Sequence, residues 1–305
     1  MGSVIDAIFT VLAVAVPLAL AAAYLKRAYT LSRERRPVPG WRQLSFICGM
    51  LVICIATSGP LESLAEEMVT THMVQHLLLA DVSSLLLVLG LTGPVMQPLL
   101  ANRAARPLRI LTHPVVAISL FTFNLFLWHS PPLYQAVLYS EPLHVLEHLL
   151  FIGTGVLLFM PLFGPLPKPE WFGKGAHVVY TAGIWLPAMV LANTLMWSDS
   201  NFYPDYAHTA MAHGLDPLAD QSTGGAILMV ECMIAALGIF AWVFLRWAKE
   251  DIERQELLDL AQDSGVELSS ARAGRAVAAG RGAELRIRVE SEGVERAAAD
   301  SRLSP

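Results

Sequence analysis

Long apolar runs separated by short polar links dominate the first 247 residues of the chain. An α-helix rises ~1.5 Å per residue, so roughly 20 residues cross a hydrocarbon core of ~30 Å. Seven runs reach or approach this length, which predicts an all-α membrane bundle of seven transmembrane helices. The runs cover approximately residues 4–25, 42–58, 70–90, 113–130, 143–162, 177–196 and 223–247.

The links between these runs carry residues that end helices. They include RRPVPG, GLTGP, SPP and GPLPKP, in which proline and glycine interrupt helical hydrogen bonding. The seven runs are therefore expected to be separate helices.

Composition supports a membrane protein. Hydrophobic residues make up 54% of the 305 residues and charged residues only 15%, where soluble domains average ~25% charged. All three cysteines lie inside apolar runs, so no disulfide framework is expected. The lipid bilayer is the expected environment, and no nucleic-acid partner is expected.

Lysine and arginine alternate between the links, and this alternation predicts orientation. Cytoplasmic loops of membrane proteins are enriched in both residues. The first, third and fifth links and the C-terminal flank carry them, whereas the second, fourth and sixth have none. The N-terminus is therefore expected outside and the C-terminus in the cytoplasm. The basic residues are Lys26, Arg27, Arg33, Arg35, Arg36 and Arg42, then Arg103, Arg106 and Arg109, then Lys168 and Lys174, and finally Arg246 and Lys249.

The last 58 residues differ from the rest. Residues 248–305 are rich in Ala, Arg, Glu, Gly and Ser and lack aromatic side chains. We expect residues 1–247 to form the transmembrane domain and 248–305 a charged cytoplasmic tail. A short helix from Lys249 to about Leu260 is expected, followed by mostly disordered chain. The tail has too little apolar surface to compensate for the conformational entropy that is lost when a chain becomes ordered.

Histidines gather at one boundary of the predicted bundle. HMVQH opens the third run and HVLEH opens the fifth, so His72 with His76 and His144 with His148 are spaced four apart. Such pairs share a helix face and can reach one metal ion. His129 closes the fourth run at the same level. These five histidines predict a metal or cofactor site on the outer side, against the alternative that they are solvated interfacial residues.

The candidate ligands favour copper. Imidazole suits copper, zinc and iron, while thioether favours Cu(I). Met73 lies between the first two histidines, and Glu147 is placed to bind metal or a ring N–H. Packing of Met73 and solvation of Glu147 are the alternatives.

Enzyme signatures are not visible. HMVQH lacks the glutamate that a HExxH zinc protease uses as its base, and no GxSxG, P-loop or dinucleotide fingerprint occurs. We expect no enzymatic activity, with a zinc-dependent membrane hydrolase as an alternative.

Four motifs in order resemble those of a known family. They are THMVQHLLL with LLLVLGLTGP, LTHPVVA, the segment from WHSPPLYQAVLYSEPLHVLEH to MPLFG, and GLDPLADQSTGGAILM. The region of about 42–247 resembles the CtaG family of bacterial cytochrome c oxidase assembly factors, of the seven-span integral membrane type.

The resemblance implies a bacterial plasma-membrane protein that helps cytochrome c oxidase mature, at the stage of copper delivery. Its partners would be oxidase subunits and copper chaperones. The matching positions are the two histidine pairs and the DPLADQ segment with Asp220, which would either cap the seventh helix or bind metal. Gly224 and Gly225 are expected to let that helix pack closely. The chain departs from the family pattern after His76, where Asp81, Ser83 and Ser84 stand.

Three other functions compete with copper delivery. The first is a haem-binding redox protein with axial ligands such as His76 and His148. The second is the zinc-dependent hydrolase, and the third is an assembly scaffold without metal.

Overall fold

The computed structural model describes residues 2–101, 106–278 and 280–303, and all regular structure in these ranges is helical. Arg103 lies outside the described residues. The helices are α1 (Gly2–Arg33), α2 (Gly40–Ala56), α3 (Pro60–Ala65), α4 (Val69–Leu77), η1 (Leu78–Ser83), α5 (Ser84–Gly90), α6 (Gly93–Ala101), α7 (Arg106–Leu111), α8 (Pro114–Trp128), α9 (Pro131–Ala136), η3 (Val137–Tyr139), α10 (Glu141–Phe163), α11 (Lys174–Trp197), η4 (Pro204–Tyr206), α12 (Ala207–Ala212), α13 (Pro217–Asp263), α14 (Ser270–Ala278) and α15 (Gly282–Leu303). The chain forms two compact units, residues 1–236 and 237–305.

Five helices within the described residues are long and apolar enough to cross a membrane. They are Ile8–Arg33 within α1, Val69–Gly90 formed by α4, η1 and α5 together, α10, α11 and α13. The all-helical membrane fold is thus confirmed. The second and fourth predicted runs form shorter apolar helices, α2 with 17 residues and α8 with 15. Seven crossings therefore remain a prediction.

The long helices expose apolar side chains on their outer faces. Only 11% of the most apolar window of α1 is buried, and Leu149 on α10 and Val190 on α11 are more than half exposed. A soluble protein rarely leaves such continuous apolar surface open. Lipid is the medium that this surface fits.

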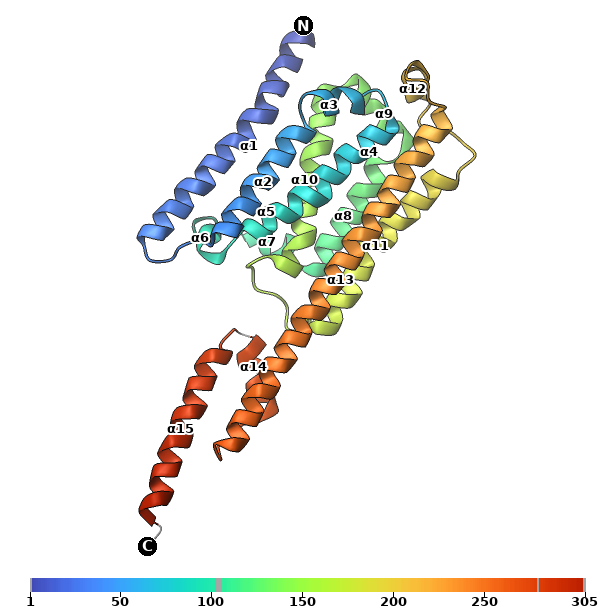
Figure 1. Cartoon of the computed structure of the whole chain (residues 1–305). Coiled ribbons are helices and arrows are strands. Elements are labelled where there is room, and N and C mark those ends of the chain that lie inside the picture. Colours follow the sequence, from blue (N-terminus) through green and yellow to red (C-terminus); the bar gives the residue numbers. More distant parts are fainter. Residues whose placement is uncertain (1, 102–105, 279, 304–305) are drawn as a thin grey trace. The chain divides into compact units, whose positions relative to one another are not determined.

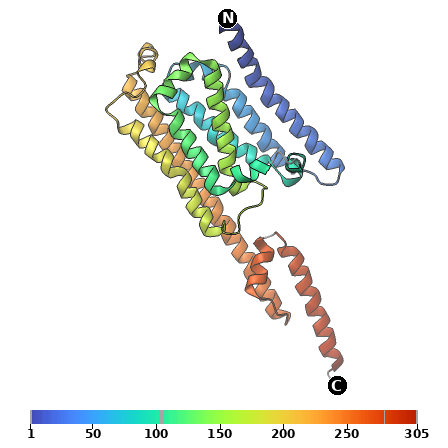
Figure 2. The ribbon, with the colours of Figure 1, turned by 180° about the vertical axis from the view of Figure 1, so that it is seen from behind.

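The span that carries the first histidine pair lies at the centre of the first unit. It runs between α2 and α10 and appears in cyan in Figure 1, and from behind in Figure 2. The turn η1 is π-helical, and its Leu79 carbonyl accepts hydrogen bonds from Ser83 Oγ at 2.7 Å and Ser84 Oγ at 3.0 Å. Ser84 Oγ also donates to Ile152 O of α10 at 3.1 Å. Of the serines that depart from the family pattern, Ser84 therefore links this widened turn to α10, whereas Ser83 bonds within it.

Glycines set how closely the helices approach. A Cβ on Gly155 of α10 would collide with the Ala80 carbonyl and lie 2.6 Å from Ser84 Oγ. On α13, a Cβ at Gly225 would lie 2.8 Å from Ala192 O, and one at Gly224 3.1 Å from Met73 Cγ. The predicted close packing at Gly224 and Gly225 is confirmed.

The second unit contains helices where we expected mostly disordered chain. Helix α13 continues to Asp263, and α14 and α15 follow it. They bury one small apolar cluster, and Arg286 forms an ion pair with Glu256 at 2.6 Å. The physical reason is spacing: the few apolar residues stand four apart on each helix, which makes a stripe. The cluster consists of Leu257, Ala261, Val266, Ala273, Val277, Leu285 and Val289.

Candidate metal centre

Helix α4 begins at a point fixed by a carboxylate from α13. Asp220 is 2% exposed, and its two oxygens accept hydrogen bonds from Val69 N at 2.8 Å and Thr70 N at 3.1 Å. Met68, the residue before the helix, makes no side-chain cap of its own. An anion is favoured at a helix N-terminus, where N–H groups lack helical partners. Asp220 therefore positions the helix that carries His72 and His76.

Helix α10 presents three donor residues in two turns. It begins at Glu141, where an acidic side chain suits the positive end of the helix dipole, with Pro142 at the next position. His144, Glu147 and His148 follow at the i, i+3 and i+4 positions of one face. All three are at most 5% exposed.

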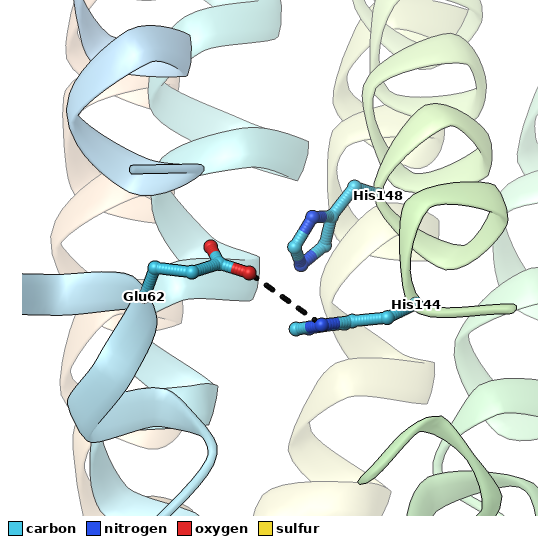
Figure 3. A group of neighbouring side chains, drawn as sticks. All are labelled: Glu62, His144 and His148. Carbon is cyan, nitrogen blue, oxygen red and sulfur yellow. Dashed lines mark ion pairs between the residues drawn. The ribbon is translucent and has the colours of Figure 1, made fainter. Parts of the chain in front are cut away.

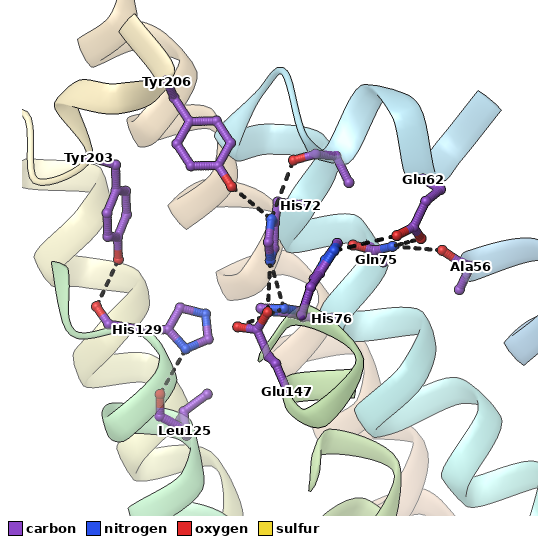
Figure 4. A network of polar contacts seen from close by, with 12 residues as sticks. Ala56, Glu62, His72, Gln75, His76, Leu125, His129, Glu147, Tyr203 and Tyr206 are labelled. Carbon is purple, nitrogen blue, oxygen red and sulfur yellow. Dashed lines mark hydrogen bonds and ion pairs between the residues drawn. The ribbon is translucent and has the colours of Figure 1, made fainter. Parts of the chain in front are cut away.

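His72, His76 and Glu147, named here the inner cluster, bring their donor atoms together inside the first unit (Figure 4). His72 Nε2 lies 2.8 Å from His76 Nε2 and 3.5 Å from Glu147 Oε2. His76 Nε2 lies 3.3 Å from Glu147 Oε1. Ligands ~2.0 Å from one ion in tetrahedral geometry stand about 3.3 Å apart. The three separations are therefore close to those that a single small cation requires.

The other side of the His72 ring is held by two oxygens. Nδ1 lies 2.9 Å from the hydroxyl of Tyr206 and 3.3 Å from the carbonyl of Ala65. With the proton on Nδ1, the ring donates towards these oxygens and leaves Nε2 as an acceptor for a metal. Metal-binding histidines are commonly oriented by such a partner.

His129 lies beside the inner cluster, with its ring centre 5.4 Å from that of His76. Its Nδ1 donates to Leu125 O at 2.8 Å, and its Nε2 is buried with no hydrogen-bond partner among the described residues. Tyr203, a fully buried side chain, donates to the His129 carbonyl at 3.0 Å and stacks on Tyr134. His129 therefore offers an additional nitrogen close to the cluster.

His144 and His148 face Glu62 of α3, and these three residues are named the outer cluster. His144 Nδ1 lies 3.5 Å from Glu62 Oε1. Gln75, fully buried, donates from Nε2 to Glu62 Oε2 and to Ala56 O and so orients the carboxylate. Burial, with the negative charges of neighbouring carboxylates, raises the pKa of Glu62 to about 8. A cation here would stabilise the ionised form.

Two predicted ligands point elsewhere. Met73, 1% exposed, packs against Gly224 of α13, and both carboxylate oxygens of Asp220 accept backbone hydrogen bonds. Of the two alternatives for Asp220, capping is the one the structure displays, although the helix capped is α4. The remaining predicted residues, His72, His76, His129, His144, His148 and Glu147, lie together.

Three residues of this region were not predicted from the sequence. Glu62 comes from a short helix outside the apolar runs, Tyr206 comes from the sixth link, and Gln75 carries an amide rather than a typical metal-ligand group. For Gln75, its position between His72 and His76 in the sequence was the one indication that it lies near the site. For the other two, no local pattern indicates which helix they approach.

Buried polar atoms without partners support a bound cation. His76 Nδ1, both oxygens of Glu147 and the Nε2 atoms of the two outer-cluster histidines make no hydrogen bond among the described residues. Burying such atoms unsatisfied costs about 1–3 kcal/mol each. A cation in the inner cluster would satisfy the Glu147 oxygens, and one in the outer cluster would accept an imidazole lone pair, so the donors present fit metal ions.

Comparison with known proteins assigns the family. Residues 22–250 match the model of the cytochrome c oxidase caa3 assembly factor family, Caa3_CtaG. The matched region contains all the candidate metal ligands. The chain therefore belongs to this family.

Mycobacterial relatives are similar over most of this chain. An uncharacterized protein of Mycobacterium leprae is 22% identical over 241 residues, which is 72% of this chain and 36% of that protein. Uncharacterized proteins of Mycobacterium bovis and Mycobacterium tuberculosis are each 21% identical, over 76% of this chain and 38% of theirs. The chain thus spans little more than a third of these relatives. No solved structure matches it.

Proposed function

We propose that this protein is a non-enzymatic membrane assembly factor for cytochrome c oxidase that binds copper at the inner cluster and assists its delivery to the oxidase. The observation that carries the proposal is the convergence of three buried donors, His72, His76 and Glu147, at separations suited to one ion. Membership of the oxidase assembly family supplies the biological setting. Copper is here a cargo, and its recipient would be an oxidase subunit.

Copper is preferred over other metals because of the donor set. Two imidazoles and a carboxylate bind first-row divalent metals in an order that peaks at Cu²⁺. The thioether of Met73 packs against α13, which makes the soft Cu(I) ion a poorer match than Cu(II). Zinc suits the same ligands, so the metal must be identified by measurement.

The proposed topology has seven crossings, with α2 and α8 as the two shorter ones. The N-terminus would lie outside and the C-terminal unit in the cytoplasm, as the distribution of lysine and arginine favours. The histidine clusters then lie on the outer side of a bacterial plasma membrane. Copper chaperones and oxidase subunits would reach them there.

The packing of the rings favours an ion over a haem. The rings of His144 and His148 are 4.2 Å apart between centres, those of His72 and His144 are 5.5 Å apart, and Tyr134 lies 4.8 Å from His72. A porphyrin would have to separate rings that already contact one another. A small cation needs no such rearrangement.

The experiment compares the metal content of the protein purified in detergent with that of the His72→Ala/His76→Ala variant, by elemental analysis and absorbance. We expect copper in the wild type and its loss in the variant. The matched control is His208→Ala/His213→Ala, which removes two exposed histidines outside both clusters. Zinc in place of copper, a haem absorbance band, or equal copper in both histidine variants would contradict the proposal.

A cellular readout separates copper delivery from scaffolding. Cells that carry only the His72→Ala/His76→Ala protein at normal level should contain oxidase with reduced activity and copper content. Fully active oxidase in these cells would refute delivery through the inner cluster and favour a metal-free scaffold.

A further inference from the structure

The outer cluster has the features of a second metal site, and none of its residues belongs to the inner cluster. Glu62, His144 and His148 offer three ligand atoms within 4.8 Å of one another. Figure 3 shows the two rings and the carboxylate turned towards a common point. The carboxylate comes from α3, whereas the inner histidines come from α4.

Two buried nitrogen atoms of this cluster lack partners. His144 is 3% exposed and His148 is 5% exposed, yet the Nε2 atom of each makes no hydrogen bond among the described residues. The local fold gains nothing from burying an imidazole in this way, because desolvation of a polar atom is unfavourable without a partner. A metal ion accepts nitrogen lone pairs of this kind, and His144 also presents its Nδ1 to Glu62 at 3.5 Å.

Burial of the donors increases in steps from the surface inwards. Glu66 is exposed and Glu141 is half-buried, and both have a ligand atom within 4.8 Å of His144. The side chain of Glu62 is 21% exposed, whereas those of His72 and Glu147 are fully buried. A hydrated cation would therefore meet the carboxylates first.

The two clusters are close enough for an ion to pass between them. Ring centres of His72 and His144 are 5.5 Å apart, and those of His76 and His148 are 6.3 Å apart. On α10, Glu147 of the inner cluster stands between the two outer histidines in sequence. A cation leaving one pair of imidazoles would thus find the other pair close by.

We propose that Glu62, His144 and His148 form a separate uptake site, through which Cu(II) from solvent passes to His72, His76 and Glu147. This step rests on the proposed function. The ion exchanges ligands without any redox change: it loses water as carboxylate and imidazole replace it, and then moves to the second pair of imidazoles.

The number of nitrogen donors increases inwards and gives the transfer its direction. The group at the surface consists of Glu66, Glu141 and His144, which offer two carboxylates and one imidazole. The inner and outer clusters each offer two imidazoles and one carboxylate. Nitrogen donors favour copper, while carboxylate and water suit harder cations. The inner cluster also lies beside His129, whose free Nε2 adds a further nitrogen. The ion is therefore held more tightly as it moves inwards.

The experiment measures how fast copper reaches the inner cluster of the full chain in detergent. Protein is mixed with Cu(II), a strong chelator is added after a set time, and the copper that resists the chelator is counted by elemental analysis. Glu62→Gln keeps the size and one acceptor oxygen for Gln75 but removes the carboxylate ligand of the outer cluster. We expect it to slow the gain of resistant copper roughly tenfold or more, as the loss of a supporting group at a metal site does, with an unchanged final amount.

His144→Gln is a second variant that should give the same result, and chromatography and thermal unfolding verify that both variants are folded. Glu67→Gln is the matched control, because Glu67 pairs with His213 outside both clusters. It should load at the wild-type rate.

The route is overturned if Glu62→Gln loads as fast as wild type, or if its final amount of resistant copper falls, which would make Glu62 part of a single site. If the Glu147→Gln variant instead holds as much resistant copper as the wild type, the proposed function is overturned. The two failures are therefore distinguishable.

Discussion

Replacing Gly155 by alanine should separate the two halves of the inner cluster. A Cβ at this position would lie 2.6 Å from Ser84 Oγ and 2.9 Å from Ser84 Cβ, and closer still to the carbonyl of Ala80. Carbon atoms in contact prefer ~3.5–4.0 Å, so α10 must move by about 1 Å. Glu147 stands eight residues earlier on α10, about 12 Å along its axis. The shift would carry it away from the α4 histidines.

The expected magnitudes follow from two opposed effects. Overpacking costs ~1–3 kcal/mol, and the removal of a helical glycine returns ~0.5–1 kcal/mol, so Gly155→Ala should lower the free energy of unfolding by up to ~2.5 kcal/mol. Metal ligands must stand within about 0.2 Å of their ideal distances. Copper affinity should therefore fall on the order of 10- to 100-fold, as when a supporting contact of a metal site is lost.

Gly153→Ala is the control, because nothing lies within 4 Å of a Cβ there. It should leave copper affinity unchanged and leave stability equal or up to ~1 kcal/mol higher. The assays are denaturant unfolding in detergent and copper titration against a competing chelator. Equal stability and equal affinity of the two alanine variants would refute the reasoning that Gly155 sets the distance between α10 and η1.

Three further outcomes are expected. Asp220→Ala leaves two N–H groups at the start of α4 without their acceptors, so denaturant unfolding should reveal a loss of about 1–3 kcal/mol, and wild-type stability would contradict the capping role. Tyr206→Phe removes the hydroxyl beside His72 and should weaken copper binding roughly 10-fold or more in a chelator titration. Tyr139→Phe, which removes an exposed hydroxyl, should leave copper binding unchanged. Val289→Asp buries a charge in the apolar cluster of the second unit and should make α14 and α15 sensitive to trypsin, whereas Ile287→Asp, at a 67% exposed position, should leave them protected.

The helices and the shared face of each histidine pair could be predicted because both depend on local spacing. Apolar runs of about 20 residues give spanning helices, and a separation of four places two imidazoles on one side. The helices of residues 264–303 were missed for a related reason. Their apolar residues are few, and composition outweighed the four-residue spacing of pairs such as Ala273 with Val277 and Leu285 with Val289.

The sequence by itself determined that the chain is a membrane helical bundle with five histidines at one level. Only the tertiary structure decided which carboxylate joins which pair: Glu147 of α10 faces the histidines of α4, while Glu62 of α3 faces those of α10. It also turned Met73 towards α13 and assigned Asp220 to the start of α4. The physical reason is that periodicity fixes the faces of one helix, whereas the rotation and depth of two helices relative to each other depend on nonlocal contacts. Here one such contact is the close approach at Gly155.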